Sequence, residues 1–217
     1  MKIVLVIDFD GTITDEDFFA YLKEAFLEED ALEPWQLYLN GELSHFNALK
    51  NIFGTLRVSE NELQNLINTV KVDPEVYPLF ELCHNLNMPI YIASAGCNYY
   101  INKLIGEEIN KYGITLITNP SSYSQSGGLK MDMPSEDDLF YHPDTGISKR
   151  KVVEILQEQD YRVIFAGDGP PDIEPARIAD VVFARKMLLE KCLQENIKTE
   201  TFNSCADIYT YIKEQPK

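Results

Sequence analysis

The sequence is poor in positive charge and in long apolar stretches. Its 217 residues carry 19 lysines and arginines against 35 acidic residues, which gives a formal net charge of -16. An acidic surface repels nucleic acids and anionic membranes, so neither is expected as a partner. No apolar run approaches the roughly 20 residues of a membrane span. The first run, residues 3–7, is too short for a signal peptide and ends at Asp8. We therefore expect a cytoplasmic protein.

Patterns typical of zinc sites and disulfide scaffolds are also missing. Cys83, Cys97, Cys192 and Cys205 lie far apart without a C-x-x-C pair, and the three histidines show no metal-ligand spacing. Scattered cysteines of this kind are typical of buried free thiols in a reducing compartment. The sequence thus predicts neither a zinc site nor a disulfide-stabilised fold.

What the chain does have is an apolar strand that ends in two aspartates. Residues 3–7 read I-V-L-V-I and lead into Asp8, Phe9 and Asp10. A β-branched run of this kind is typical of a strand buried on both faces of a parallel sheet. Since alternate residues of a strand point the same way, Asp8 and Asp10 are predicted to share one site at the carboxyl end, where such sheets bind ligands. Two neighbouring carboxylates are costly unless a cation lies between them.

The next part of the chain is helical. Apolar residues recur at helical spacing from residue 15 onward, and no strand is evident before residue 72. This is too much chain for a simple crossover between two strands, so we predict a small helical cap over the end of the first strand. Helix starts are expected at Thr14, Pro34, Ser44, Ser59 and Asp73.

Strands and helices alternate from residue 86, as in a doubly wound α/β domain. We predict a three-layer, Rossmann-like α/β core with a mostly parallel sheet over residues 1–13 and 86–217, and the inserted helical cap over residues 14–85. Residues 119–147 are irregular and are expected to form a hairpin or a long loop. The expected strands are 89–93, 114–118, 163–166 and 181–184, and the expected helices are 98–112, 148–159, one ending at 179, 186–195 and 205–214.

Four more polar residues occupy positions where a ligand-binding loop is expected. Ser94, and the pair Asp168 and Asp172, each follow a predicted strand, and Lys149 begins a helix. A carboxylate can attack phosphorus and form an aspartyl-phosphate, while a second one protonates the leaving oxygen and then activates water. Mg²⁺ prefers one or two carboxylates together with substrate phosphate. A serine hydroxyl and a lysine can hold the other phosphoryl oxygens.

In this order, these motifs resemble those of the haloacid dehalogenase (HAD) superfamily, and specifically its phosphatase branch. The segment D-F-D-G-T at residues 8–12 matches the first motif, Ser94 the second, Lys149 the third, and G-D-G-x-x-D at residues 167–172 the fourth. Lys149 has close competitors in Arg150 and Lys151. We favour Lys149 because it lies nearest the helix start, and the choice between Lys149 and Lys151 stays open here. The likeness extends over nearly the whole chain.

The resemblance implies a role for each matching residue. Asp8 would be the nucleophile and Asp10 the general acid and base. Mg²⁺ would be bound by Asp8, the main-chain carbonyl of Asp10, and Asp168, with Asp172 supporting them from nearby. Ser94 and Lys149 would hold the phosphoryl group, and the substrate would be a small-molecule phosphate monoester.

A helical insertion between the first two motifs resembles the subgroup of phosphoserine phosphatase. The segment with Phe183, Ala184 and Arg185 resembles the methionine-salvage phosphatases that act on 2-hydroxy-3-keto-5-methylthiopentenyl-1-phosphate, although residues 94–96 read Ser-Ala-Gly where those enzymes have Ser-Gly-Gly. The resemblance makes Asp17, Lys50, Ala95 and Gly96 candidates for substrate binding.

Phosphoserine is the first alternative substrate. In phosphoserine phosphatases an acid after the first motif holds the amine, as Asp17 would, and a cap arginine holds the carboxylate. Lys50 stands where that arginine is expected, and Arg57 follows later in the chain. Lysine lacks the bidentate fork of arginine, which disfavours this substrate.

An alternative of another class is a signalling module that is phosphorylated on aspartate, as receiver domains are. These modules also combine acids, a serine or threonine, and a lysine on a doubly wound sheet. The second aspartate of D-x-D and the large cap favour the enzyme. The sequence makes no prediction of oligomeric state.

Overall fold

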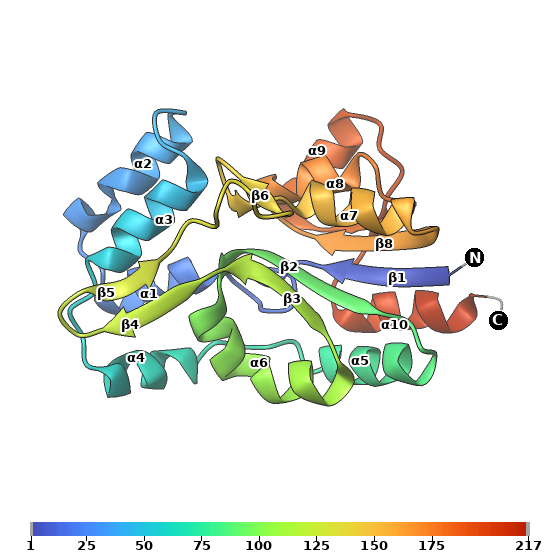
Figure 1. Cartoon of the computed structure of the whole chain (residues 1–217), viewed down its shortest axis with the longest axis horizontal. Coiled ribbons are helices and arrows are strands. Elements are labelled where there is room, and N and C mark those ends of the chain that lie inside the picture. Colours follow the sequence, from blue (N-terminus) through green and yellow to red (C-terminus); the bar gives the residue numbers. More distant parts are fainter. Residues whose placement is uncertain (1, 216–217) are drawn as a thin grey trace.

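The computed structural model describes residues 2–215, and a six-stranded sheet lies at its centre (Figure 1). Its strand order is β10-β9-β8-β1-β2-β3, and each neighbouring pair is parallel. The α/β class with a mostly parallel sheet, predicted from the sequence, is confirmed. Strand β10 has only two residues, so no apolar period in the sequence could have predicted it. The strands are β1 (Lys2–Ile7), β2 (Ile90–Cys97), β3 (Thr115–Asn119), β8 (Tyr161–Gly167), β9 (Val181–Ala184) and β10 (Glu200–Thr201).

Helices cover both faces of this sheet, which explains the apolar run of β1. Val4 and Val6 belong to the core cluster under α7 and α9, whereas Leu5 and Ile7 belong to the cluster of α5, α6 and α10. Figure 1 shows these two helical layers above and below the sheet. The alternation of side chains along a strand thus buries both faces of β1. The helices are α5 (Val76–Asn85), α6 (Asn98–Tyr112), α7 (Lys149–Glu158), α8 (Ile173–Ala176), α9 (Lys186–Gln194) and α10 (Cys205–Glu214).

The helices between residues 18 and 67 lie beyond the carboxyl end of the sheet (Figure 1). Two of the predicted starts are confirmed by their caps. Ser44 accepts a hydrogen bond from the backbone N–H of Asn47, and Ser59 forms a reciprocal capping box with Glu62. The helices are α1 (Phe18–Phe26), a 3₁₀ turn at Glu29–Leu32, α2 (Glu33–Leu39), α3 (His45–Gly54) and α4 (Glu60–Ile67).

The helix start predicted at Thr14 is wrong. Thr14 is in extended backbone and forms an isolated antiparallel bridge with Val72, so the two segments that connect the core with the cap lie side by side. Helix α1 begins only at Phe18, and its first N–H groups are not capped by the side chain of Asp17. The N–H of Phe18 instead donates to the carboxylate of Asp10.

The cap boundary near residue 85 stays a prediction, and the packing of α5 bears on it. Helix α5 packs against α10 and α6, beneath the sheet. This packing favours a core that resumes near residue 72, after the bridge at Val72. Conversely, the hairpin of β4 (Ser121–Ser124) and β5 (Gly128–Met131) packs against α3 of the cap. Of the two forms expected for residues 119–147, a hairpin or a long loop, the structure shows the hairpin, and β6 (Tyr141–His142) and β7 (Gly146–Ile147) form a second one.

All four cysteines are buried and free, as their scattered spacing predicts. Within residues 2–215, no helix combines the length and the apolar character that crossing a membrane requires.

Candidate active site

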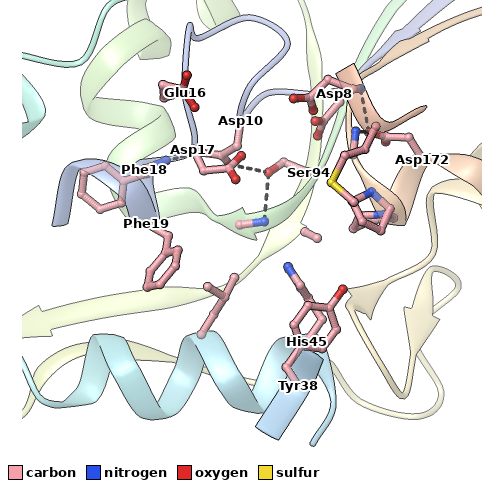
Figure 2. Close-up of a pocket in the computed structure, with 18 of the residues that line it drawn as sticks. Asp8, Asp10, Glu16, Asp17, Phe18, Phe19, Tyr38, His45, Ser94 and Asp172 are labelled. Carbon is pink, nitrogen blue, oxygen red and sulfur yellow. Dashed lines mark hydrogen bonds between the residues drawn. The ribbon is translucent and has the colours of Figure 1, made fainter. Parts of the chain in front are cut away.

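The polar residues predicted at strand ends meet in one cavity of about 560 Å³ at the carboxyl edge of the sheet. Asp8 follows β1, Ser94 lies in β2, and Lys149 is the first residue of α7. Figure 2 shows Asp8, Asp10, Ser94 and Asp172 on one side of this cavity, with Tyr38 and His45 across from them. The lining residues include Asp8, Asp10, Ser94, Lys149, Asp168 and Asp172.

A buried lysine joins two of the carboxylates. The Nζ atom of Lys149 lies 2.6 Å from Asp8 Oδ1 and 2.6 Å from Asp172 Oδ1, and all three side chains are at most 6% exposed. Burial alone would lower the pKa of Lys149, but the charges and hydrogen bonds of Asp172 and Asp8 raise it above its usual value, so the amine is charged. Lys151 instead pairs with Glu154 at 3.6 Å on the surface. The structure thus places Lys149, and not Lys151, in the cavity.

Three aspartates form a candidate metal centre. Asp8, Asp168 and Asp172 each offer a carboxylate oxygen, and these oxygens lie within 4.8 Å of one another. Desolvation and the charge of Asp172 raise the pKa of Asp8 well above its usual value and that of Asp168 to about 6. Lys149 and the partly exposed Lys186, which lies 3.2 Å from Asp168, do not balance these three carboxylates. The donor set therefore fits Mg²⁺, which takes carboxylate oxygens and relieves their repulsion.

Asp10 points away from this cluster and is fixed by three donors. Its Oδ1 accepts from the N–H of Phe18 at 3.1 Å, and its Oδ2 accepts from the hydroxyls of Ser94 at 3.2 Å and of Tyr100. Desolvation raises the pKa of Asp10, while these hydrogen bonds act in the opposite direction. Burial and the nearby Asp10 raise the pKa of Tyr100 well above its usual value, so its hydroxyl is a donor.

An irregularity in β2 places Ser94 and the turn that follows it. The register between β2 and β3 shifts between Ser94 and Cys97, where β2 has extra residues. The buried Asn119 donates from Nδ2 to the carbonyls of Ala95 at 2.9 Å and Gly96 at 3.1 Å, and so holds this turn from below. The Ser94 hydroxyl accepts from the N–H of Gly96 at 3.0 Å.

Aromatic rings from the cap form the opposite wall. The ring centroid of Trp35 lies 4.6 Å from that of Phe19 and 5.0 Å from that of Tyr38. The ring centroids of Tyr38 and His45 are 5.2 Å apart. Burial lowers the pKa of His45 to about 4, so its imidazole is neutral, and its Nδ1 has no hydrogen-bond partner among the described residues. Asp17 lines the cavity as well. The wall is mostly apolar and presents no charge from α2 or α3.

The candidate substrate residues divide into two groups. Asp17, Ala95 and Gly96 line the cavity, as the sequence predicts. Lys50 is exposed and is not among the lining residues, and its ammonium lies over the ring of Phe46 at 6.0 Å. Helix α3 turns its apolar face inward, which carries Lys50 to the outer surface.

Sequence reasoning missed a basic pair that supports the site. The Arg185 guanidinium donates to the main-chain carbonyls of Gly11, Thr12 and Thr14, and Lys186 lies 3.2 Å from Asp168. Lys186 has a φ of +48°, a left-handed conformation that is strained for a lysine. Arg185 lies between β9 and α9 and Lys186 begins α9, the same strand-to-helix position that singled out the other site residues. The same signal would have found them.

Thr12, Tyr100 and His45 were also missed as site residues. The Thr12 hydroxyl lies 3.4 Å from Asp168 Oδ1 and 3.5 Å from Asp8 Oδ2. Tyr100 and His45 lie on helices whose apolar period hides which residue faces a cavity.

Comparison with known proteins agrees with this geometry. The profile of a protein family described as Putative Phosphatase matches residues 3–211. The chain belongs to this family. It is 26% identical over 215 residues to 2-hydroxy-3-keto-5-methylthiopentenyl-1-phosphate phosphatase of Bacillus thuringiensis (strain Al Hakam), covering 98% of this chain and 97% of that protein. The same holds for the enzyme of that name from Bacillus anthracis (strain A0248).

Solved structures share the fold of this phosphatase. A HAD family hydrolase from Salmonella enterica serovar Typhi has a TM-score of 0.73 at 14% identity, over 98% of this chain and 72% of that one. Phosphoserine phosphatase from T. onnurineus has a TM-score of 0.65 at 19% identity, over 100% of this chain and 96% of that one. The prediction made from the motifs, that the protein is a HAD phosphatase and hence a phosphoric monoester hydrolase, is therefore confirmed at the level of family and fold.

Proposed function

We propose that this phosphatase hydrolyses a small-molecule phosphate monoester through an aspartyl-phosphate on Asp8, with Mg²⁺ as cofactor. The observation that carries the proposal is the convergence of Asp8, Asp168, Asp172 and Lys149 on the floor of one cavity, with Asp10 beside them. Bound at the three aspartates and the main-chain carbonyl of Asp10, Mg²⁺ would neutralise charge on the carboxylates and on the substrate phosphate.

The chain's own residues divide the reaction into two steps. In the first, a carboxylate oxygen of Asp8 attacks phosphorus, the bond from phosphorus to the leaving oxygen breaks, and Asp10 gives that oxygen its proton. In the second, Asp10 takes a proton from water, the hydroxide attacks phosphorus, and Asp8 is released with inorganic phosphate. Lys149 and the Ser94 hydroxyl hold the phosphoryl oxygens, whose negative charge a buried cation stabilises strongly.

The cavity supports a leaving group that is uncharged and largely apolar, as in the methionine-salvage type of substrate. Its cap wall is formed mainly by apolar side chains, including Phe19, Trp35 and Tyr38, and by the neutral His45, and the acidic residues Glu16 and Asp17 also line the cavity. Among the described residues no arginine lines the cavity, and its two lysines, Lys149 and Lys186, already pair with carboxylates of the floor. A second anionic group on the substrate would therefore lack a partner.

Phosphoserine remains the second candidate because Asp17 lines the cavity, where it can meet an amine. The carboxylate of phosphoserine finds less support. Lys50 is outside the cavity, and Arg57 donates to the carbonyls of Gly54 and Leu56 at the far end of α3. We therefore rank phosphoserine below an uncharged substrate.

The test is release of inorganic phosphate from a panel of monoesters, with Mg²⁺ and after its removal by a chelator. The panel contains a methylthio-ketopentenyl phosphate, phosphoserine, sugar phosphates and an aryl phosphate. We expect turnover that requires Mg²⁺ and is fastest for an uncharged apolar leaving group. Fastest turnover of phosphoserine would overturn our ranking of substrates, and multiple turnover with the chelator present would overturn the role of Mg²⁺.

A variant of the nucleophile separates the enzyme from a signalling module. Asp8→Asn is expected to fold and to lose turnover by orders of magnitude, because an amide cannot form the phosphorylated intermediate. Asp132→Asn, which alters a carboxylate paired with Lys130 at the surface, is the matched control and should retain full activity. A wild-type protein that keeps its phosphoryl group on Asp8 without further turnover would favour the receiver-like alternative.

A further inference from the structure

We propose that Tyr100 is a positioning residue, which holds the carboxylate of Asp10 in the orientation that proton transfer to the leaving oxygen requires. The inference rests on the proposed function, because it assigns a task to Asp10 in that reaction. Tyr100 itself does not touch the reacting atoms in this account. It acts through the hydrogen bond from its hydroxyl to Asp10 Oδ2.

The ring of Tyr100 is held as firmly as its hydroxyl. Its side chain is 1% exposed, and it stacks on Phe18 with ring centroids 4.2 Å apart and planes 20° apart. Phe9 contacts it from a second side, with centroids 6.1 Å apart. A ring clamped in this way loses little entropy when its hydroxyl meets a carboxylate, so the bond fixes a direction as well as adding energy.

Gly96 leaves the space that the hydroxyl occupies. A Cβ atom on Gly96 would lie 1.8 Å from the Tyr100 hydroxyl oxygen and 2.7 Å from Asp10 Oδ2. No larger residue fits there while the hydrogen bond exists. Two segments far apart in the chain thus meet in one contact: Asp10 after β1, and the stretch from Gly96 at the end of β2 to Tyr100 in the first turn of α6.

The contact matters because, within residues 2–215, no cationic side chain forms an ion pair with Asp10 that could orient it. Lys149, the buried cation of the site, pairs with Asp8 and Asp172 instead. The Ser94 hydroxyl also donates to Asp10, but at 3.2 Å, and it is expected to bind a phosphoryl oxygen during the reaction. When the hydroxyl of Ser94 turns to the phosphoryl group, Tyr100 is the side-chain donor that remains on Oδ2.

The experiment compares Tyr100→Phe with wild type on two kinds of ester. An alkyl phosphate needs a proton on its leaving oxygen, whereas p-nitrophenyl phosphate releases a stable phenolate without one. We expect Tyr100→Phe to lower kcat for the alkyl ester about tenfold or more, with KM within about twofold. The burst of nitrophenol that reports phosphorylation of Asp8 should slow much less. A merely structural role would slow the phosphorylation of Asp8 by both esters alike.

Two controls keep the outcome decisive. Tyr99→Phe removes the neighbouring hydroxyl, which donates to Glu60 on the cap surface at 3.2 Å, and should leave kcat unchanged for both esters. Tyr100→Phe should also have no further effect on catalysis in an Asp10→Asn background, because a residue that acts through Asp10 has nothing left to orient. Folding is checked by thermal unfolding of each variant.

The contrary outcomes are distinguishable. Equal losses in the rate of Asp8 phosphorylation for the two esters, or a loss that adds to that of Asp10→Asn, would overturn the role of Tyr100 and leave the phosphatase mechanism standing. Absence of any phosphate release by the wild-type protein would overturn both.

Discussion

Replacing Asp168 by asparagine should stabilise the metal-free protein while it abolishes turnover. Asp168 is 7% exposed and shares its site with Asp8 and Asp172. Desolvation and the Asp172 charge raise its pKa from 3.8 to about 6 in the folded chain. An aspartate with a raised pKa favours folding while it is protonated, and this contribution is lost as pH rises through the folded pKa. Above pH 7 the ionised carboxylate therefore opposes folding.

The magnitude follows from that difference in pKa. Each unit is worth about 1.4 kcal/mol, so a difference of about 2 units corresponds to about 3 kcal/mol. Asparagine has nearly the same shape, and its amide oxygen can still accept from the Thr12 hydroxyl. We expect Asp168→Asn to raise the free energy of unfolding by about 3 kcal/mol at pH 8, and by less than about 1 kcal/mol at pH 4, where the wild-type carboxyl is protonated in the folded chain.

Chemical denaturation in the presence of a chelator, at both pH values, measures this gain. Asp132→Asn, at the surface, is the control and should change neither value by more than about 0.5 kcal/mol. Added Mg²⁺ should stabilise wild type and much less the variant, since one of its three carboxylates is gone. A variant that is no more stable than wild type at pH 8, or a gain that persists at pH 4, would refute the argument that repulsion among these acids is relieved by a cation.

Two further perturbations test the framework of the site and the cap. Lys149→Met leaves Asp8 and Asp172 buried without their shared cation, so it should lower the free energy of unfolding by about 3–5 kcal/mol at pH 8 and abolish nearly all activity. Lys151→Met, at the surface, is the control and should change either quantity little. Equal losses in the two variants would contradict the buried triad. Ser59→Ala removes the capping box of α4 and should cost about 1 kcal/mol in the same assay, and no measurable loss would show that this cap contributes nothing to stability.

The predictable part of the fold and site came from short-range signals. The apolar run before Asp8 and Asp10 identifies a buried parallel strand, and the carboxyl ends of such strands meet at one edge. That rule brought Ser94 and Asp168 to the same cavity without any knowledge of distances. The caps of α3 and α4 were predictable for the same reason, because a capping serine acts within one helical turn.

The rest depends on contacts between distant segments. Thr14 carries the signature of a helix cap, yet pairing with Val72 fixes it in extended backbone and α1 begins later. Lys50 lies at the expected place in the sequence but on the outer side of α3. Tyr100 looks like an ordinary core aromatic, and the approach of Asp10 from a distant segment gives its hydroxyl a partner. Helical periodicity identifies a buried face but not the residue on it that borders a cavity.

The most direct test of the central claim is to identify the phosphorylated residue during turnover. Wild-type protein is mixed with substrate and Mg²⁺, quenched in acid within milliseconds, digested and examined by mass spectrometry, with Asp8→Asn treated in parallel. We predict a phosphoryl group on Asp8 that forms and decays at the rate of turnover and is absent from the variant. Phosphate on another residue, or steady turnover by Asp8→Asn, would contradict the account.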